Sequence, residues 1–386
     1  MNRRRTSVGK SAPAAWRAMA RGLALSFAFL PGGGALAQEQ VTKEQFPAPT
    51  RDYSPYVDQH FPNRVFWGDT HLHTSYSTDA GMIGCTLGPE EAYRFARGEE
   101  VRSSTGQRVK LPRPYDFLVV SDHAENLGLA PMIATSDPIL LKTEVGKQWH
   151  DMVKAGKGFE AFGDWVKRGS TTGKDPIGSP EMMRAAWEYI VKAAERYNEP
   201  GRFTAFIGYE WTSTPGGNNL HRNVIFRDGG QLALGILPFS AYDSPDPEML
   251  WKWMQAYEDR TGGRLLAIPH NGNLSNGRMF AVESMGGKPF DRAYAETRAR
   301  REPLLEVTQP KGTSETHPAL SPTDEFAGFE IWDKSNLGGT EATTKEMLPG
   351  NYARSALKMG LAFEEKLGAN PFKFGLIGST DSHTGL

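Results

Sequence analysis

Gly68-Asp69-Thr70-His71-Leu72-His73-Thr74 is the stretch of this 386-residue chain on which the fold prediction depends. The apolar and aromatic run 64–67 comes just before it and is predicted to be a strand. Residues two apart in an extended chain point to the same face, so His71 and His73 are expected to aim at one point. Two neutral imidazoles that converge are the beginning of a transition-metal site. A lone His-x-His pair also occurs at ordinary surface strand ends, so the remaining ligands must come from elsewhere in the chain.

Further apolar runs typical of strands recur along the chain, and polar residues accompany most of them. These runs are 116–120, 203–207, 221–226, 265–268, 304–307, 328–332 and 374–378. Helical patterns lie at 89–98, 180–196, 246–259 and 351–367. Strands that alternate with helices predict parallel βα units, and an α/β barrel builds its site at the carboxyl ends of its strands. Residues 126–200 read as a mostly helical insertion that would form a lid or side subdomain.

Histidines and carboxylates gather at the ends or starts of these runs. The histidines are His71, His73, His123, His221, His270 and His383, and the carboxylates are Asp69, Asp79, Asp122, Glu210 and Asp381. Asp381 and His383 repeat the i, i+2 geometry of the first pair. Imidazole and carboxylate together suit Zn, Mn or Fe better than Ca or Mg. One ion cannot use so many ligands, so two or three divalent transition-metal ions bridged by a carboxylate are predicted.

The N-terminus predicts a secretory signal peptide over residues 1–37. A basic start, Arg3 to Arg5, precedes an apolar run at 22–30 and a small-x-small sequence that ends at Ala37, where cleavage is expected. The apolar run is too short to span a bilayer, and an uncleaved membrane anchor is the alternative. We therefore predict a secreted or periplasmic protein, with a linker or N-terminal arm over 38–63 and the main domain over 64–386.

Charge and cysteine content narrow the possible partners. The chain has a formal net charge of −1, and removal of a signal with six basic and no acidic residues leaves −7. A mildly acidic mature protein is not expected to bind nucleic acid, and no apolar run in its sequence predicts a membrane span. The single cysteine, Cys85, excludes an internal disulfide and is expected to be a packed or loop thiol.

The order of these motifs resembles the polymerase and histidinol phosphatase (PHP) superfamily of metal-dependent phosphoesterases over residues 64–386. The matching residues are His71 and His73, Asp122-His123, Glu210, His221, His270, and Asp381 with His383. Asp79 falls where many relatives have another metal ligand, commonly histidine. The resemblance implies a distorted (β/α)7 TIM-like barrel of PHP type. It also implies a trinuclear metal site held by His71, His73, Asp79, His123, Glu210, His221, His270, Asp381 and His383.

Finer features are similar to a less studied branch, domain of unknown function 3604 (DUF3604). They lie in segments 66–71, 91–98 and 121–125. Members of that branch generally continue past this end point. The chain also ends three residues after His383, where a covering helix would be expected. We therefore expect a fragment truncated at its C-terminus.

The favoured function is a metal-dependent phosphoesterase, in which a hydroxide held between ions bridged by Glu210 attacks phosphorus. Asp381 or His383 would move protons. Arg222 and Lys311 are candidates to hold an anionic ester substrate, with solvated surface charge as the alternative. Asn271 would contact substrate or hold the turn after His270. Two other functions stay open: hydrolysis of another ester or an amide bond, and a non-catalytic protein with structural metal ions.

Two further sets of residues near the motifs have two interpretations each. Glu306 and Glu330 are either partners of ligating histidines or exposed edge residues. Trp67, Trp211 and Trp332 are expected to pack in the core, with substrate stacking as the alternative.

Overall fold

The computed structural model describes residues 64–386, apart from the side chains of residues 170–172. The predicted signal peptide (1–37) and arm (38–63) lie outside the described residues. Within that described part, no helix combines the length and the apolar character needed to cross a bilayer.

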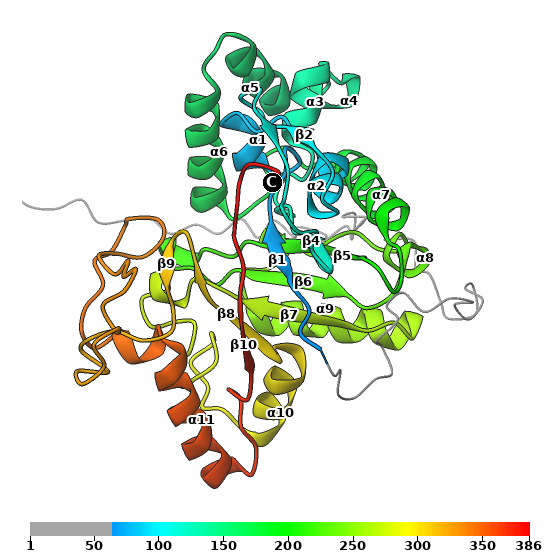
Figure 1. The fold of residues 1–386 in the computed structure, drawn as a ribbon. Coiled ribbons are helices and arrows are strands. Elements are labelled where there is room, and N and C mark those ends of the chain that lie inside the picture. Colours follow the sequence, from blue (N-terminus) through cyan, green and yellow to red (C-terminus); the bar gives the residue numbers. More distant parts are fainter. Residues whose placement is uncertain (1–63) are drawn as a thin grey trace, which may run out of the picture. The chain divides into compact units, whose positions relative to one another are not determined.

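A five-stranded sheet forms the centre of this mixed α/β fold and curls into a half-barrel (Figure 1). Its strands, in spatial order, are β1 (Gly68–Leu72), β4 (Phe117–Val120), β5 (Thr204–Trp211), β6 (Arg222–Phe226) and β7 (Leu265–Pro269). The first three are parallel, whereas β6 is antiparallel to both of its neighbours. The parallel prediction is therefore wrong for β6, because the short connection 212–221 contains only a 3-10 turn and cannot make the crossover that parallel strands need.

A second, three-stranded sheet lies beside the first. Its order is β10 (Gly375–Gly378), β8 (Leu304–Gln309) and β9 (Gly312–Thr313), with β8 and β10 parallel and β9 closing a hairpin. The segment after β10 runs beside β1, where Ser382 bridges to Leu72 and its carbonyl accepts from His73 N at 2.8 Å (Figure 1). On the other side, β8 lies next to β7. The carboxyl ends of β1, β5 and β10 consequently meet in one region.

Two predicted strands differ from the structure. Residues 64–67 precede β1, which begins at Gly68, contains His71 and ends one residue before His73. The strand predicted at 328–332 is wrong, because residues 325–330 form turns and Glu330 has a φ of 50°. Phe329 and Trp332 in that segment are 69% and 52% exposed, so its apolar pattern does not mark a core face.

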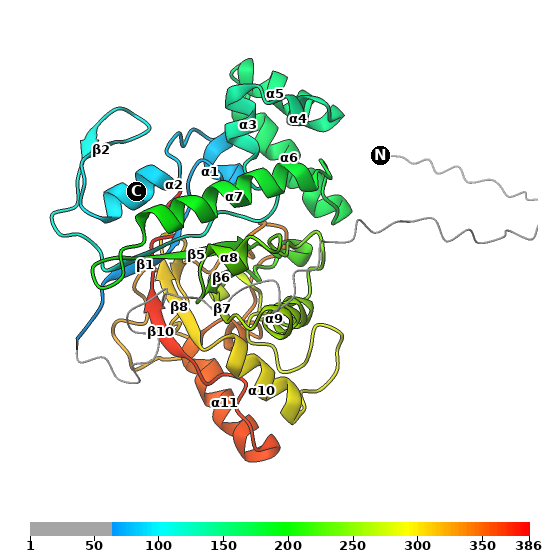
Figure 2. The ribbon, with the colours of Figure 1, turned by 90° about the vertical axis from the view of Figure 1, so that its right-hand side faces the viewer.

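Helices α2 (Pro89–Ala96) and α7 (Pro180–Tyr197) cover β4 and β5 (Figure 2). Helix α7 begins as predicted, because Ser179 Oγ accepts from Met182 N at 3.3 Å and Pro180 occupies the first turn. Trp187 of α7 is buried in the same core as β4 and β5. The predicted helices at 246–259 and 351–367 are confirmed as α9 (Pro247–Thr261) and α11 (Ala353–Leu367). Helix α10 (Arg292–Arg301) lies between them in sequence, and a short hairpin joins β2 (Val101–Arg102) to β3 (Arg108–Val109).

The segment predicted as one insertion, 126–200, divides into two parts. Helices α3 (Leu129–Thr135), α4 (Pro138–Leu141), α5 (Glu144–Lys154) and α6 (Gly158–Thr172) enclose their own small core around Leu140 and Trp149. The short α1 (Thr78–Met82) packs against α3 and α6. Helix α7 instead packs on the sheet, so the side subdomain consists of α3 to α6.

Trp187→Ala tests whether α7 packs on the central sheet as part of the main core. The indole is 1% exposed and its Nε1 donates to Ala233 O at 3.0 Å, so its loss leaves a cavity and an unpaired carbonyl. We expect the free energy of unfolding in urea to fall by about 3–5 kcal/mol. Phe159→Ala, at a 76% exposed aromatic of α6, should change it by about 0.5 kcal/mol or less. Equal effects of the two substitutions would contradict the assignment.

Candidate metal centre

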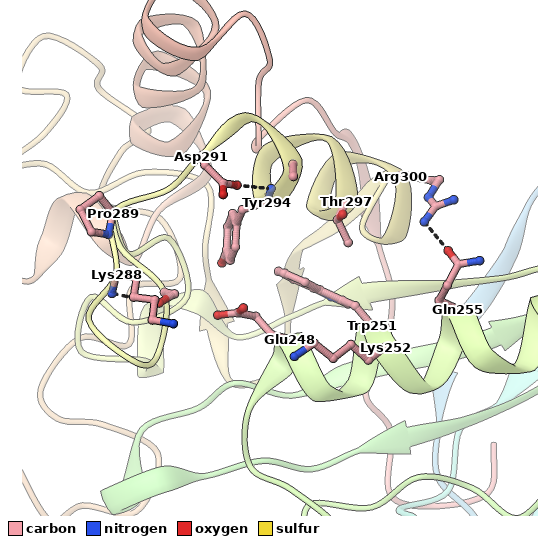
Figure 3. A pocket seen from close by; sticks show the side chains of 12 residues that line it. Glu248, Trp251, Lys252, Gln255, Lys288, Pro289, Asp291, Tyr294, Thr297 and Arg300 are labelled. Atoms are coloured by element: carbon pink, nitrogen blue, oxygen red, sulfur yellow. Dashed lines mark hydrogen bonds between the residues drawn. The ribbon is translucent and has the colours of Figure 1, made fainter.

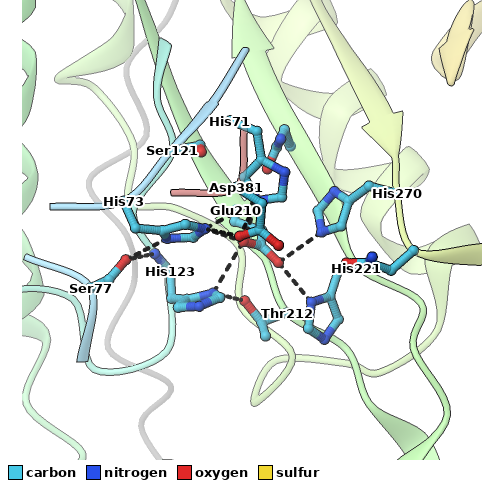
Figure 4. Close-up of polar contacts among 12 residues, drawn as sticks. His71, His73, Ser77, Ser121, His123, Glu210, Thr212, His221, His270 and Asp381 are labelled. Atoms are coloured by element: carbon cyan, nitrogen blue, oxygen red, sulfur yellow. Dashed lines mark hydrogen bonds and ion pairs between the residues drawn. The ribbon is translucent and has the colours of Figure 1, made fainter. Parts of the chain in front are cut away.

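Glu210 lies at the middle of a buried cluster of histidines, at the carboxyl end of β5 (Figure 4). Its Oε2 is 3.2 Å from His71 Nε2, 3.1 Å from His73 Nε2 and 3.3 Å from His123 Nδ1. Its Oε1 is 2.7 Å from His221 Nδ1 and 3.1 Å from His270 Nε2. The two oxygens thus face different sets of imidazoles, which is the arrangement of a carboxylate that could bridge two ions.

His71 and His73 point to the same side of the chain, as their spacing of two residues predicts. The Nε2 atoms of His71 and His73 lie 3.0 Å apart, while Leu72 between them packs in the sheet core. Asp69, one strand period before His71, does not join the cluster. It accepts hydrogen bonds from His71 N at 2.9 Å and from Thr380 Oγ1 at 2.5 Å, and so ties β1 to the segment that carries Asp381.

Three ligand atoms form a compact cage. They are His71 Nε2, His73 Nε2 and Asp381 Oδ1, and their separations lie between 3.0 and 3.3 Å. A tetrahedral zinc ion with bonds of about 2.0–2.1 Å keeps its ligand atoms about 3.3 Å apart. The three atoms therefore have the spacing that one ion requires, and Glu210 Oε2 lies 3.1–3.2 Å from both histidine nitrogens.

Two more groups adjoin this cage. Glu210, His221 and His270 form one, and His73, His123 and His383 form the other. Asp79 joins the second group, because its Oδ2 is 3.1 Å from His123 Nε2 and 2.9 Å from His383 Nε2. All nine predicted ligands thus lie together in one region, and groups of them could hold metal ions.

Three of these histidines have a second partner on the ring nitrogen that faces away from Glu210. Glu306 Oε2 is 3.0 Å from His71 Nδ1, Ser77 Oγ is 2.7 Å from His73 Nδ1, and Thr214 Oγ1 is 2.8 Å from His221 Nε2. Thr212 Oγ1 is 2.6 Å from His123 Nδ1, the nitrogen that also faces Glu210. Partners of this kind fix the tautomer and orientation of ligating imidazoles. Glu306 is therefore a partner and not an exposed edge residue, and it also lies within reach of His270 in a possible ligand group.

Sequence reasoning missed the hydroxyl partners. Thr212 was open to prediction, since it is two residues after Glu210 and so continues the same face of the chain. Ser77 has no comparable signal. It occupies the turn after β1, where its hydroxyl also donates to Asp122 Oδ1 at 3.1 Å. Asp122 accepts from Thr74 N and Oγ1 as well, so it holds this turn and leaves the ligand role to His123.

Burial and charge set the protonation of the centre. Burial alone would raise the pKa of Glu210, but the neighbouring His123 and His270 hold that pKa well below its usual range. Burial and nearby imidazoles lower the pKa of His73 to about 4 and that of His270 to about 3. Burial raises the pKa of Glu306 to about 7 against the opposing effect of His71. Burial would lower the pKa values of His71 and His123, but neighbouring carboxylates raise both above the usual value. Because metal binds ionised carboxylates and neutral imidazoles, these two rings would release protons on metal binding.

The three predicted substrate residues have different positions. Arg222 is 1% exposed and donates from Nε to Glu302 Oε1 at 2.9 Å. It begins β6 directly after the inward-facing His221, and so it points to the opposite side. This placement favours a structural role. Lys311 is at the centre, where its one-third exposed ammonium pairs with Asp381 Oδ2. Asn271, in the left-handed region at φ 50°, accepts from Gln309 Nε2 at 2.5 Å.

The solvent exposure of the cysteine, three tryptophans and Glu330 tests the remaining predictions. Cys85 is a packed thiol beside Ala80 and Leu87, as predicted. Trp211 is buried in the core, but Trp67 and Trp332 are 59% and 52% exposed, so core packing is the wrong expectation for those two. Glu330 is exposed in its turn.

A pocket of about 400 Å³ lies elsewhere, between α9 and α10 (Figure 3). Trp251 and Tyr294 supply its aromatic walls, and Glu248, Lys252 and Lys288 supply charges. Its lining includes none of the nine predicted ligands. The pocket is therefore separate from the candidate metal centre.

A buried cluster of imidazoles and carboxylates at the strand ends of a curled α/β sheet defines a protein with a candidate multinuclear metal centre. Residues 60–386 match the family model described as "Protein of unknown function (DUF3604)", so the chain belongs to that family. The curated proteins contain no match to the chain.

Glu306→Ala tests whether the carboxylate partner of His71 contributes to metal binding. The substitution removes the carboxylate on His71 Nδ1 and frees the ring to rotate. We expect the affinity for Zn²⁺, measured by competition with a chromogenic chelator, to fall about 10- to 100-fold. Glu325→Ala, at an exposed carboxylate, is the matched control and should leave the affinity unchanged. An unchanged affinity in Glu306→Ala would contradict this role.

Proposed function

We propose that this protein is a metal-dependent hydrolase of the PHP superfamily and that it cleaves phosphoric esters. The observation that carries the proposal is the position of Glu210, whose two oxygens face separate sets of histidines. Phosphatases and nucleases with two metal ions use centres in which the ions are about 3.5–4 Å apart. A carboxylate that offers one oxygen to each side supports such a spacing.

Strand connectivity supports the superfamily proposal. The main sheet contributes β1, β4, β5, β6 and β7, and the second sheet contributes β8 and β10. The bridge between Leu72 and Ser382 joins one pair of sheet edges, and β7 lies beside β8 at the other. We interpret these seven strands as a distorted (β/α)7 barrel with β6 reversed. The order of the ligands along the chain supports the same superfamily.

The donor set of imidazoles and carboxylates suits Zn, Mn or Fe. Two or three such ions, when bound, would supply an activated water and would stabilise charge on the leaving oxygen. The chain's own residues would do the rest. Lys311 and Asn271 would hold the non-reacting oxygens of the substrate.

Asp381 and His383 would have different tasks. Gln309 Nε2 and Lys311 Nζ both hold Asp381 Oδ2, which leaves Oδ1 directed at His71 and His73. Asp381 therefore acts as a ligand and not as a free base. The side chain of His383 is 22% exposed, more than those of the other histidines of the centre. His383 is thus the better candidate to exchange a proton with the leaving group.

Two other functions are compatible with the same residues. The chemistry would also serve another ester or an amide, because fold does not fix substrate. A non-catalytic protein would hold the ions with no open coordination position. The ammonium of Lys311 beside the centre favours an anionic ester. Secretion through the predicted signal peptide is part of the proposal.

Metal content tests the proposal first. Elemental mass spectrometry on purified protein should find two or three equivalents of Zn, Mn or Fe, because nine ligand residues converge. The double variant His71→Ala/His73→Ala should lose at least one equivalent, since it removes two of the three ligands of the cage. His317→Ala is the control, because that imidazole pairs with Asp333 and belongs to none of the ligand groups.

Hydrolysis tests the second half of the proposal. Metal-loaded protein should cleave phosphate mono- or diesters, and removal of the ions by a chelator should abolish the activity. Wild-type protein that binds no transition metal after reconstitution would overturn the proposal. Loaded protein that cleaves only carboxylic esters or amides would overturn the phosphoesterase part alone.

A further inference from the structure

Trp332 is an exposed aromatic residue whose backbone lies close to the candidate metal centre. Its side chain is 52% exposed, and Phe326 and Phe329, on the turns before it, are 74% and 69% exposed. Large apolar side chains on a surface need an explanation when they gather in one short segment. The metal centre, as described above, makes no use of them.

Asn273 links Trp332 to the centre. This fully buried amide donates from Nδ2 to Lys311 O at 3.1 Å and to Trp332 O at 2.9 Å. The two carbonyl oxygens can therefore lie no more than about 6 Å apart. Since Lys311 Nζ pairs with Asp381, a short series of contacts leads from Trp332 to the ligands.

The backbone around Trp332 is held in place. Thr313 N donates to Glu330 O at 2.9 Å, which lays this segment along β9. Gly312, with a φ of 100°, presses against it so closely that a Cβ there would lie 2.7 Å from Trp332 Cβ. At the start of the segment, Arg354 binds both Glu315 and Asp324. An exposed indole on a fixed backbone loses little conformational freedom when it binds a ligand.

We propose that Trp332 determines substrate specificity by stacking on an aromatic or other flat apolar ring of the esterified alcohol. This inference rests on the proposed function, in which Lys311 holds the phosphoryl oxygens at the metal centre. The substrate class is then a phosphate ester with an aryl or similarly flat apolar alcohol. Stacking pairs of this kind are worth a factor of about three to ten in affinity.

Phenylphosphonate and methylphosphonate provide the test, because neither is hydrolysed and they differ in the ring alone. Their affinities for zinc-loaded protein are measured by calorimetry, together with metal content. Wild type should bind phenylphosphonate about three- to tenfold more tightly than methylphosphonate. Trp332→Ala should lose that difference and keep its affinity for methylphosphonate, and Trp332→Phe should retain most of the difference. Trp67→Ala is the control, since that 59% exposed indole precedes β1 at the opposite end of the strand from His71.

The outcomes separate the two proposals. Failure of loaded wild type to bind either phosphonate would overturn the proposed function and this inference with it. Equal binding of the two ligands by wild type, or an unchanged preference in Trp332→Ala, would overturn the inference alone. A variant that weakens both ligands equally would also overturn it, because the indole would then support the centre in general and not the ring.

Discussion

The burial of Glu210 among five imidazoles is the constraint on which the rest of the centre depends. A carboxylate that is 1% exposed needs compensating positive charge. The histidines cannot all supply it as protonated rings, because the Nε2 atoms of His71 and His73 are only 3.0 Å apart. The pKa values of the histidines in the centre therefore differ widely from one another. Carboxylates raise the pKa of His123 to about 10 against its burial, whereas burial and nearby imidazoles lower that of His270 to about 3. Divalent ions between the ligands would resolve this conflict.

The fold meets this constraint by joining distant segments at their carboxyl ends. Asp69 of β1 binds Thr380, and Ser382 bridges to Leu72, so the first and last described strands are fastened together at the centre. The hairpin between β8 and β9 brings Gln309 and Lys311 onto the far oxygen of Asp381. The same hairpin carries Trp332 on its flank through Asn273. The geometry of the candidate ligands and the position of Lys311 are therefore consequences of strand pairing.

Strand periodicity made the ligands predictable from the sequence. His71 and His73 share a face because they are two residues apart at the end of β1. Asp381 and His383 also reach the centre, but Asp381 has a φ of 49°, so the chain is not extended there and the same spacing argument does not explain their positions. Other features depend on tertiary structure. The antiparallel direction of β6 follows from the short connection 212–221. The apolar composition of residues 328–332 predicts a strand, although the segment contains a turn. Arg222 is near the centre in sequence but faces the opposite side of its strand. Ser77 has neither the spacing nor the charge that identifies a partner of the centre, whereas Thr212 has the spacing, two residues after Glu210, but no charge.

Anomalous diffraction from crystals of the metal-loaded protein tests our proposal that Glu210 bridges two ions. We expect two anomalous peaks about 3.5–4 Å apart, each about 2.0–2.2 Å from a different oxygen of Glu210. One peak would lie among His71, His73 and Asp381, and the other beside His221 and His270. A single peak, or peaks that leave either oxygen of Glu210 without an ion, would contradict the proposal.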